Sequence, residues 1–146
     1  MLPARHVLRQ SAADAADRIV LAYDERFLRR KRLTCASGAS VMVDLPQTVS
    51  LDDGDALVTD DGRKLAIVAA DEPVVVVRGN LPRLAWHIGN RHTPCEVTAT
   101  HLVIRRDHVL ENMLKTLGAD LTLTFAPFRP EGGAYGHGRT LGHSHD

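Results

Sequence analysis

The chain has 146 residues, of which 44% are hydrophobic and only 4% are aromatic. This length is enough for one ordinary domain or two small ones, and the hydrophobic fraction is enough for a packed core. Lysine plus arginine equals aspartate plus glutamate at 18 each, so no net positive field attracts nucleic acid or anionic lipid. The scarcity of aromatic side chains also argues against a stacking surface for single-stranded nucleic acid.

The sequence predicts a cytoplasmic protein without a membrane segment. The longest aliphatic runs, residues 65–70 and 74–77, are far too short to span a bilayer, and the N-terminus lacks the apolar core of a signal peptide. Two isolated cysteines, Cys35 and Cys95, offer no disulfide framework, so we expect both thiols to be reduced.

The first half of the chain, residues 1–72, is predicted to be a small all-β module. Residues 18–23 are apolar and β-branched enough for a strand. Two hairpins are predicted to follow, one around residues 36–39 and one around Asp60-Asp61-Gly62, because Asp-Gly accepts the positive φ of a hairpin turn. Residues 11–17 are compatible with either a brief helix or a loop.

The pattern changes after Pro73, where we place a domain boundary. Asn80 and Asp107 are candidate N-caps of two helices with apolar residues at helical spacing. Strands are predicted at residues 74–78, 95–100, 101–106 and 119–125. The order β-α-β-β-α-β predicts an α+β protein in which residues 73–128 form a ferredoxin-like domain, with both helices on one face of an antiparallel sheet.

Residues 129–146 are predicted to be a flexible tail, because they offer too little apolar surface to offset the entropy of ordering. Glycines are interleaved there with His137, His143 and His145. The chain has eight histidines, and three of them in the last ten residues make a bound metal worth considering.

A predicted helix-to-strand corner at residues 86–96 carries two histidines, a cysteine and a carboxylate. Gly89 and Asn90 tolerate the left-handed conformation that ends helices, and Pro94 prevents the helix from resuming. His92 is therefore expected just past a helix terminus, with its ring projecting from the domain. From these residues alone, His92 is either a structural hydrogen-bonding group or a metal ligand.

The Gly89-Asn90-Arg91-His92 tetrapeptide, with His87 before it and Pro94 after it, resembles the signature of the UreE-type urease accessory proteins, the nickel metallochaperones. The resemblance covers the whole chain, including the segment 106–110 that opens the second helix and the histidine-containing tail. It implies a carrier without catalytic residues that delivers Ni(II) to apo-urease. The implied partners are a urease accessory GTPase and, through it, the apo-urease activation complex.

The resemblance also implies where the metal binds. His92 matches the histidine that binds nickel at the homodimer interface of the family, and His143 and His145 fall where tail ligands often lie. His137 is a further candidate with reach but no fixed orientation. Because nickel takes about four to six donors, a pair of His92 rings would supply part of the site and the tails would complete it. Imidazole also suits Zn(II) and Cu(II), so either ion can substitute for nickel.

The remaining candidate ligands are expected to have structural or surface roles: His87, Cys35, Cys95, His101 and His108. Arg106 stands where some family members carry another histidine, which argues against an accessory site around His108. The basic run of residues 29–32 is either a charged strand edge or a docking surface for an acidic partner.

Two other functions remain open from the residues. One is a hydrolase that uses Cys95 or Cys35 with a histidine, although the chain lacks a nucleophile elbow and a Gly-flanked oxyanion loop. The other is a general zinc or nickel buffer, or a peptide-binding module, unrelated to urease. Exposed strand edges of the β module would suit binding of an extended segment.

Overall fold

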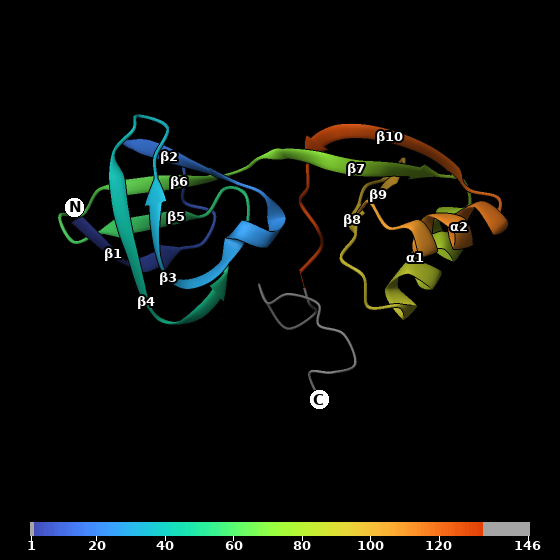
Figure 1. The fold of residues 1–146 in the computed structure, drawn as a ribbon, viewed down its shortest axis with the longest axis horizontal. Coiled ribbons are helices and arrows are strands. Elements are labelled where there is room, and N and C mark those ends of the chain that lie inside the picture. Colours follow the sequence, from blue (N-terminus) through green and yellow to red (C-terminus); the bar gives the residue numbers. More distant parts are fainter. Residues whose placement is uncertain (1, 133–146) are drawn as a thin grey trace. The chain divides into compact units, whose positions relative to one another are not determined.

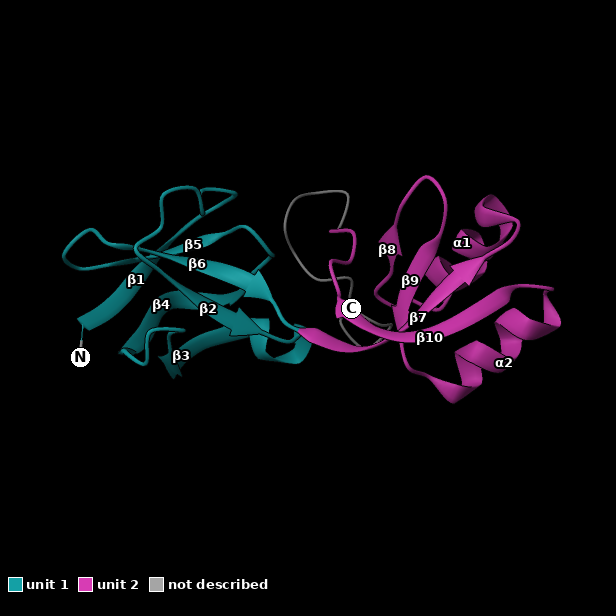
Figure 2. Ribbon diagram, turned by 90° about the horizontal axis from the view of Figure 1, so that it is seen from above, with its two compact units in different colours: residues 1–70 teal, residues 71–146 magenta. Residues whose placement is uncertain are grey.

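The computed structural model describes residues 2–132 and divides the chain into two compact units, residues 1–70 and 71–146 (Figure 2). Each unit has a hydrophobic core of its own. No helix of the described part is long and apolar enough to cross a membrane.

The first unit is a curled, six-stranded mixed sheet with strand order β2-β6-β5-β1-β4-β3 (Figure 1). Its elements are β1 (Leu2–Leu8), β2 (Asp17–Leu21), the 3-10 turn η1 (Tyr23–Arg26), β3 (Phe27–Thr34), β4 (Ser40–Ser50), β5 (Ala56–Thr59) and β6 (Lys64–Ala69). Both predicted hairpins are present, as β3–β4 and β5–β6, and Gly62 in the second turn has φ 85°.

Two features of this unit differ from, or add to, the sequence interpretation. The sequence interpretation did not identify strand β1, because Pro3 and the charged Arg5 interrupt its apolar pattern. The segment is nevertheless an inner strand of the sheet, between β5 and β4. Residues 11–16 form turns and irregular chain rather than a helix, Asp17 already belongs to β2, and Gln10 and Asp14 adopt left-handed φ angles of 50° and 61°. The loop alternative therefore holds for this segment.

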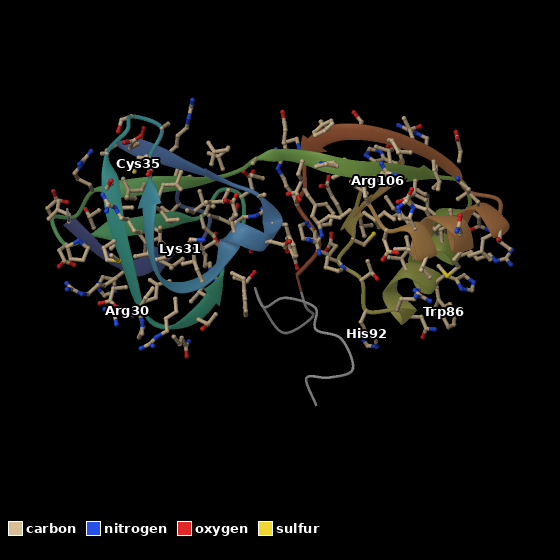
Figure 3. The ribbon with its side chains drawn as sticks, in the orientation of Figure 1. Arg30, Lys31, Cys35, Trp86, His92 and Arg106 are labelled. Atoms are coloured by element: carbon tan, nitrogen blue, oxygen red, sulfur yellow. The ribbon has the colours of Figure 1, made fainter. Side chains whose placement is uncertain are left out.

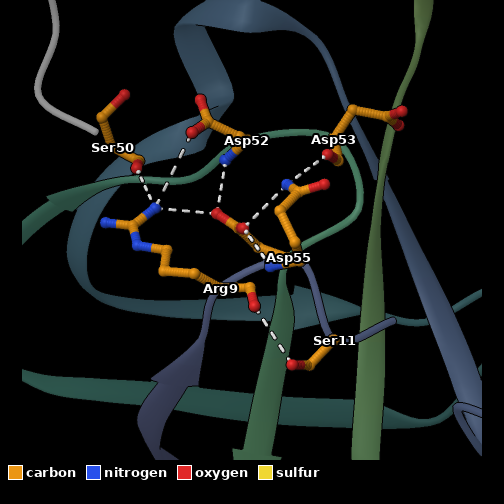
Figure 4. Close-up of polar contacts among 7 residues, drawn as sticks. Arg9, Ser11, Ser50, Asp52, Asp53 and Asp55 are labelled. Atoms are coloured by element: carbon orange, nitrogen blue, oxygen red, sulfur yellow. Dashed lines mark hydrogen bonds and ion pairs between the residues drawn. The ribbon is translucent and has the colours of Figure 1, made fainter. Parts of the chain in front are cut away.

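A buried carboxylate organises the turn that precedes β5 (Figure 4). Asp55 is fully buried and accepts hydrogen bonds from the Arg9 guanidinium at 2.7 Å, the Gln10 amide at 3.0 Å and the Asp52 amide at 2.8 Å. Arg9 also donates to the Ser50 carbonyl at 2.9 Å. One side chain thus ties residues 9–10 to the turn at residues 52–55, and it stays buried because its charge is paired and hydrogen-bonded.

Asp55→Asn is expected to lower the free energy of unfolding by about 1.5–3 kcal/mol, since the amide keeps the shape but puts an NH2 donor in place of one oxygen that accepts hydrogen bonds, and it removes the charge that pairs with Arg9. Urea unfolding of the full chain measures this loss. The exposed Asp14→Asn serves as the matched control and should change stability by less than about 0.5 kcal/mol. Equal unfolding midpoints for the two variants would contradict the assigned role of Asp55.

The second unit has the predicted β-α-β-β-α-β order. Its elements are β7 (Asp71–Arg78), α1 (Leu81–Asn90), β8 (Glu96–Val97), β9 (Leu102–Arg105), α2 (His108–Thr116) and β10 (Asp120–Pro127). The sheet has the order β10-β7-β9-β8 with every neighbouring pair antiparallel. Alternate residues of β7 and β9 pack with the apolar positions of both helices, so α1 and α2 cover one face (Figure 1). The ferredoxin-like prediction is confirmed.

Strand β8 is shorter than expected, with two residues instead of the predicted 95–100. The reason is Thr98, whose hydroxyl accepts from the His101 amide at 3.0 Å and the Thr100 amide at 3.3 Å. A threonine side chain that bonds nearby backbone groups favours a turn over a continued strand. β8 therefore forms a short edge beside the corner that carries His92.

Candidate metal centre

The position of the His92 corner is fixed by helix α1. Asn80 caps the first turn of α1, and its side-chain oxygen accepts a hydrogen bond from the Arg83 amide at 3.3 Å. Pro82 fits this turn because main-chain N–H groups in the first turn of a helix have no partner within the helix, so the missing N–H of proline costs no hydrogen bond. Leu84 and Ile88 are buried against the sheet. A helix held by this apolar face presents its C-terminal end at a defined place.

The end of α1 has a geometry that the sequence did not predict. The helix runs through Gly89 and Asn90, and the left-handed residue is His92 itself, with φ 56°. The His92 amide donates to the Gly89 carbonyl at 2.9 Å, and the Arg91 amide donates to the Ile88 carbonyl at 3.1 Å. A histidine in this conformation costs roughly 1–2 kcal/mol relative to the right-handed region. Histidine thus occupies a position where glycine would suit the backbone better.

The side chain of His92 is half-buried and points away from the sheet at the margin of the second unit (Figure 3). Trp86, one helical turn and a half earlier, is 64% exposed and meets the ring of His87 edge-on at 5.0 Å between centroids. Residues 2–132 contain no group of three or more His, Cys, Asp or Glu side chains that could hold a metal ion. His92 therefore needs ligands from elsewhere to form a complete site.

The chain after β10 returns to the same corner. Phe128 is fully buried, the Arg129 amide donates to the Glu96 carboxylate at 2.8 Å, and the Glu131 amide donates to the Cys95 carbonyl at 2.9 Å. Cys95 is three residues beyond His92 in the sequence. The last described residues are therefore bonded to the 95–96 part of the corner that carries His92.

The three predicted tail ligands, His137, His143 and His145, lie outside the described residues. Counted from Glu131, they follow after six, twelve and fourteen residues. Because an extended chain spans at most about 3.3–3.6 Å per residue, these lengths allow reaches of up to roughly 20, 40 and 50 Å. The stretch of chain between Glu131 and each of these histidines is thus long enough for the imidazole to reach a metal at His92.

The surroundings of both cysteines disfavour the thiolate form. Burial raises the pKa of the Cys95 thiol to about 11, and the side chain packs against the core of the second unit. Burial and the nearby Asp17 carboxylate also raise the pKa of Cys35, which lies in the core of the first unit. Because the thiolate is the reactive and metal-binding form, these surroundings favour the structural roles predicted for both residues.

Iodoacetamide at pH 8 is therefore expected to alkylate Cys95 at least about tenfold more slowly in the folded chain than in urea, since a pKa near 11 leaves about a hundredfold less thiolate than the ordinary value. Mass spectrometry of the labelled peptide gives the rate. Cys95→Ala should leave nickel affinity unchanged within about twofold. Equal labelling rates in the folded and unfolded chain would contradict the protonated, buried thiol.

The other histidines of the second unit have separate roles. His101 is half-buried, and its Nδ1 lies 2.8 Å from the Thr100 hydroxyl and 3.2 Å from that of Thr98. His108 is exposed at the first position of α2. His101 is thus a partly exposed turn residue that contacts two threonines, and His108 is at the surface as predicted.

Arg106 stands at the position where a histidine would support an accessory metal site. Its side chain instead forms an ion pair at the start of α2. Its Nε lies 3.2 Å from the Glu111 carboxylate, which also accepts from the Asp107 amide at 2.7 Å. Burial opposes ionisation of Glu111, but these two bonds outweigh it and lower the pKa of that carboxyl. The pair stabilises the helix terminus and offers no metal ligand.

Sequence reasoning missed two contributions to this site. Residues 128–131 are held at the His92 corner by main-chain N–H donors, and because every residue except proline has such a donor, the sequence gives no sign of these bonds. The exposure of Trp86 could have been predicted from the sequence, because Leu84 and Ile88 define the buried face of α1 and Trp86 does not lie on that face.

Comparison with known proteins agrees with the resemblance. Residues 1–70 match the model of the UreE urease accessory protein, N-terminal domain, and residues 72–146 match that of the C-terminal domain.

Among curated proteins, the chain is 58% identical over 144 residues to the urease accessory protein UreE of Cereibacter sphaeroides, covering 97% of this chain and 79% of that protein. It is 58% identical over 134 residues to that of Paracoccus denitrificans, covering 92% and 86%. It is 52% identical over 147 residues to that of Ruegeria pomeroyi, covering 99% of both chains. The chain therefore belongs to the UreE family of urease accessory proteins, which act as chaperones in urease maturation and are not enzymes.

Proposed function

We propose that the protein is a nickel carrier that delivers Ni(II) to apo-urease, with the ion held between two protomers by their His92 side chains. The observation that carries this proposal is the left-handed, half-buried His92 at the margin of the second unit. Family membership supports a role in urease maturation and the involvement of nickel in it.

The incomplete ligand set of the described residues supports a shared site. One imidazole cannot hold a divalent ion, but a two-fold axis near His92 brings a second ring without any further change in sequence. The exposed Trp86 on the same helix supplies apolar surface for such a contact. The homodimer is thus part of the proposal, and the metal is a cargo that belongs to both chains.

The tail histidines complete the coordination in this proposal. His143 and His145, with His137 as a further donor, start from the Glu131 anchor beside the corner. A rigid pair of rings with removable tail ligands suits transfer of the ion better than permanent storage. Zn(II) and Cu(II) can bind the same imidazoles, and the donor set by itself does not select nickel.

The proposed partners are the urease accessory GTPase and, through it, the apo-urease activation complex. The two cysteines of the chain are unpaired, which supports the proposed location in the reducing cytoplasm. The general buffer is the alternative, since the same ligands would bind metal without delivering it.

A strain that lacks the corresponding gene separates carrier from buffer. If the protein delivers nickel, urease in that strain is inactive at limiting nickel, and the wild-type chain or added nickel restores it. The chain with His92→Asn should not restore activity at limiting nickel but should remain folded. Full urease activity in the deletion strain at limiting nickel would favour the buffer and contradict delivery.

A further inference from the structure

Strand β3 lies at one edge of the six-stranded sheet of the first unit, and among the described residues β4 is the strand that it pairs with. Beyond its end, the Ala36 amide donates to the Arg18 carbonyl of β2 at 2.8 Å. Along residues 29–32, by contrast, no second strand is bonded in the part of the chain that the structure describes. This stretch is a free sheet edge, which agrees with the prediction that residues 29–32 form a charged strand edge.

The edge carries four consecutive cations, Arg29, Arg30, Lys31 and Arg32, which we call the β3 edge patch (Figure 3 labels Arg30 and Lys31). All four are exposed. Arg30 pairs with Asp44 at 3.1 Å, whereas the other three form no ion pair within residues 2–132. The patch thus keeps an unbalanced positive charge in a chain with no net charge.

A hollow lies next to the patch where the β3–β4 ladder is interrupted. Leu28 pairs with Val49 and Arg30 with Asp44, so the register shifts opposite Arg29 and residues 45–48 of β4 form a bulge there. The hollow has a volume of about 370 Å³ and is lined by Arg5, His6, Arg29, Asp44, Leu45 and Pro46. Asp44 pairs with Arg30 and Arg5, and Arg5 also pairs with Asp60, so Arg29 is the cation lining this hollow that has no ion pair among the described residues.

We propose that the β3 edge patch binds an extended, acidic segment of a partner protein, which adds to the sheet as a further strand. Free main-chain groups of an edge strand pair with an added strand, and the side chains that flank it select the partner. Cations on an edge repel a second copy of the same edge, but they attract a segment with carboxylates at alternate positions. One carboxylate of that segment reaches the hollow beside Arg29.

A protein segment fits these features better than a nucleic acid. A phosphate backbone offers acceptors but no donors, so it cannot pair with both the N–H and the C=O groups of a strand edge, and the chain has few aromatic residues for base stacking. The proposal does not depend on nickel, because the patch lies in the first unit and His92 in the second.

The test uses the full chain and a fluorescein-labelled (Glu-Thr)5 peptide, whose binding is followed by fluorescence anisotropy at low salt. Arg29→Gln, Lys31→Gln and Arg32→Gln together should weaken binding about tenfold or more, since each exposed ion pair contributes up to a few-fold. The matched control, Arg78→Gln, Arg83→Gln and Lys115→Gln, removes the same charge from exposed positions of the second unit and should change binding by less than about threefold. Circular dichroism verifies that both variants are folded.

Strand addition is separated from simple charge attraction by a second peptide. The same sequence with N-methyl groups on its six central amides keeps every charge but loses the donors, and it should bind at least about tenfold more weakly. Equal binding of the two peptides, equal loss in the two triple variants, or tighter binding of an oligothymidylate of equal charge would each overturn the proposal.

Discussion

Replacement of His92 by glycine is expected to weaken nickel binding by the dimer at least about a thousandfold and to leave the fold intact. A four-ligand metal site contributes about 10–16 kcal/mol, or about 2.5–4 kcal/mol for each ligand, and a dimer loses two ligands at once. The backbone gains at the same time, because the φ of 56° at this residue suits glycine. Nickel competition against a chelator measures the affinity, and urea unfolding measures the stability.

Two further variants separate the backbone from the ligand at this position. His92→Asn tolerates the left-handed conformation and should lose nickel without losing stability. His92→Ala should lose nickel and should be about 1 kcal/mol less stable than His92→Gly, because alanine keeps the Cβ that disfavours the left-handed conformation. Retention of wild-type nickel affinity in any of the three would remove His92 from the site. An alanine variant as stable as the glycine variant would contradict the left-handed assignment.

Replacement of His137, His143 and His145 by glutamine is expected to weaken nickel binding about 10–100-fold without changing the free energy of unfolding. The twelve residues from Glu131 to His143 would span about 20 Å root mean square as a flexible chain, which gives a tethered imidazole an effective concentration in the millimolar range. The measurement is again competition against a chelator, with the full-length chain.

A chain that ends at Gly132 is the matched comparison, because it removes the tail but keeps the bond from the Glu131 amide to Cys95. It should equal the triple glutamine variant in both affinity and stability. If the triple variant instead binds nickel like the wild type, the tail histidines play no part in the site. If only the shortened chain loses affinity, groups other than the imidazoles are responsible.

Much of the fold could be predicted because its signals are local. Asn80 and Asp107 mark two helix starts, and Leu84, Ile88, Leu110 and Leu114 recur at helical spacing on their buried faces. The Asp60-Asp61-Gly62 turn identifies one hairpin directly. Strand β1 escaped because its place in the sheet depends on parallel pairing with β4, more than thirty residues away.

The candidate site was less accessible from the sequence. The tetrapeptide pointed to His92, but residue preferences assign the left-handed position to Gly89 or Asn90 rather than to a histidine. The return of Glu131 to Cys95 depends on a main-chain bond between residues far apart in the chain. Long-range backbone contacts and disfavoured backbone angles are properties of the packed domain, so they cannot be predicted from the composition of the chain or the spacing of its residues.

The most direct test of the account is the nickel content of the chain that ends at Gly132, measured together with its mass by sedimentation. If two His92 rings share one ion across a two-fold axis, the protein binds one nickel for every two chains, and only as a dimer. The His92→Gly version of the same chain should bind none with comparable affinity. One ion in each monomer, or an unchanged nickel content in the glycine variant, would contradict a site shared between protomers.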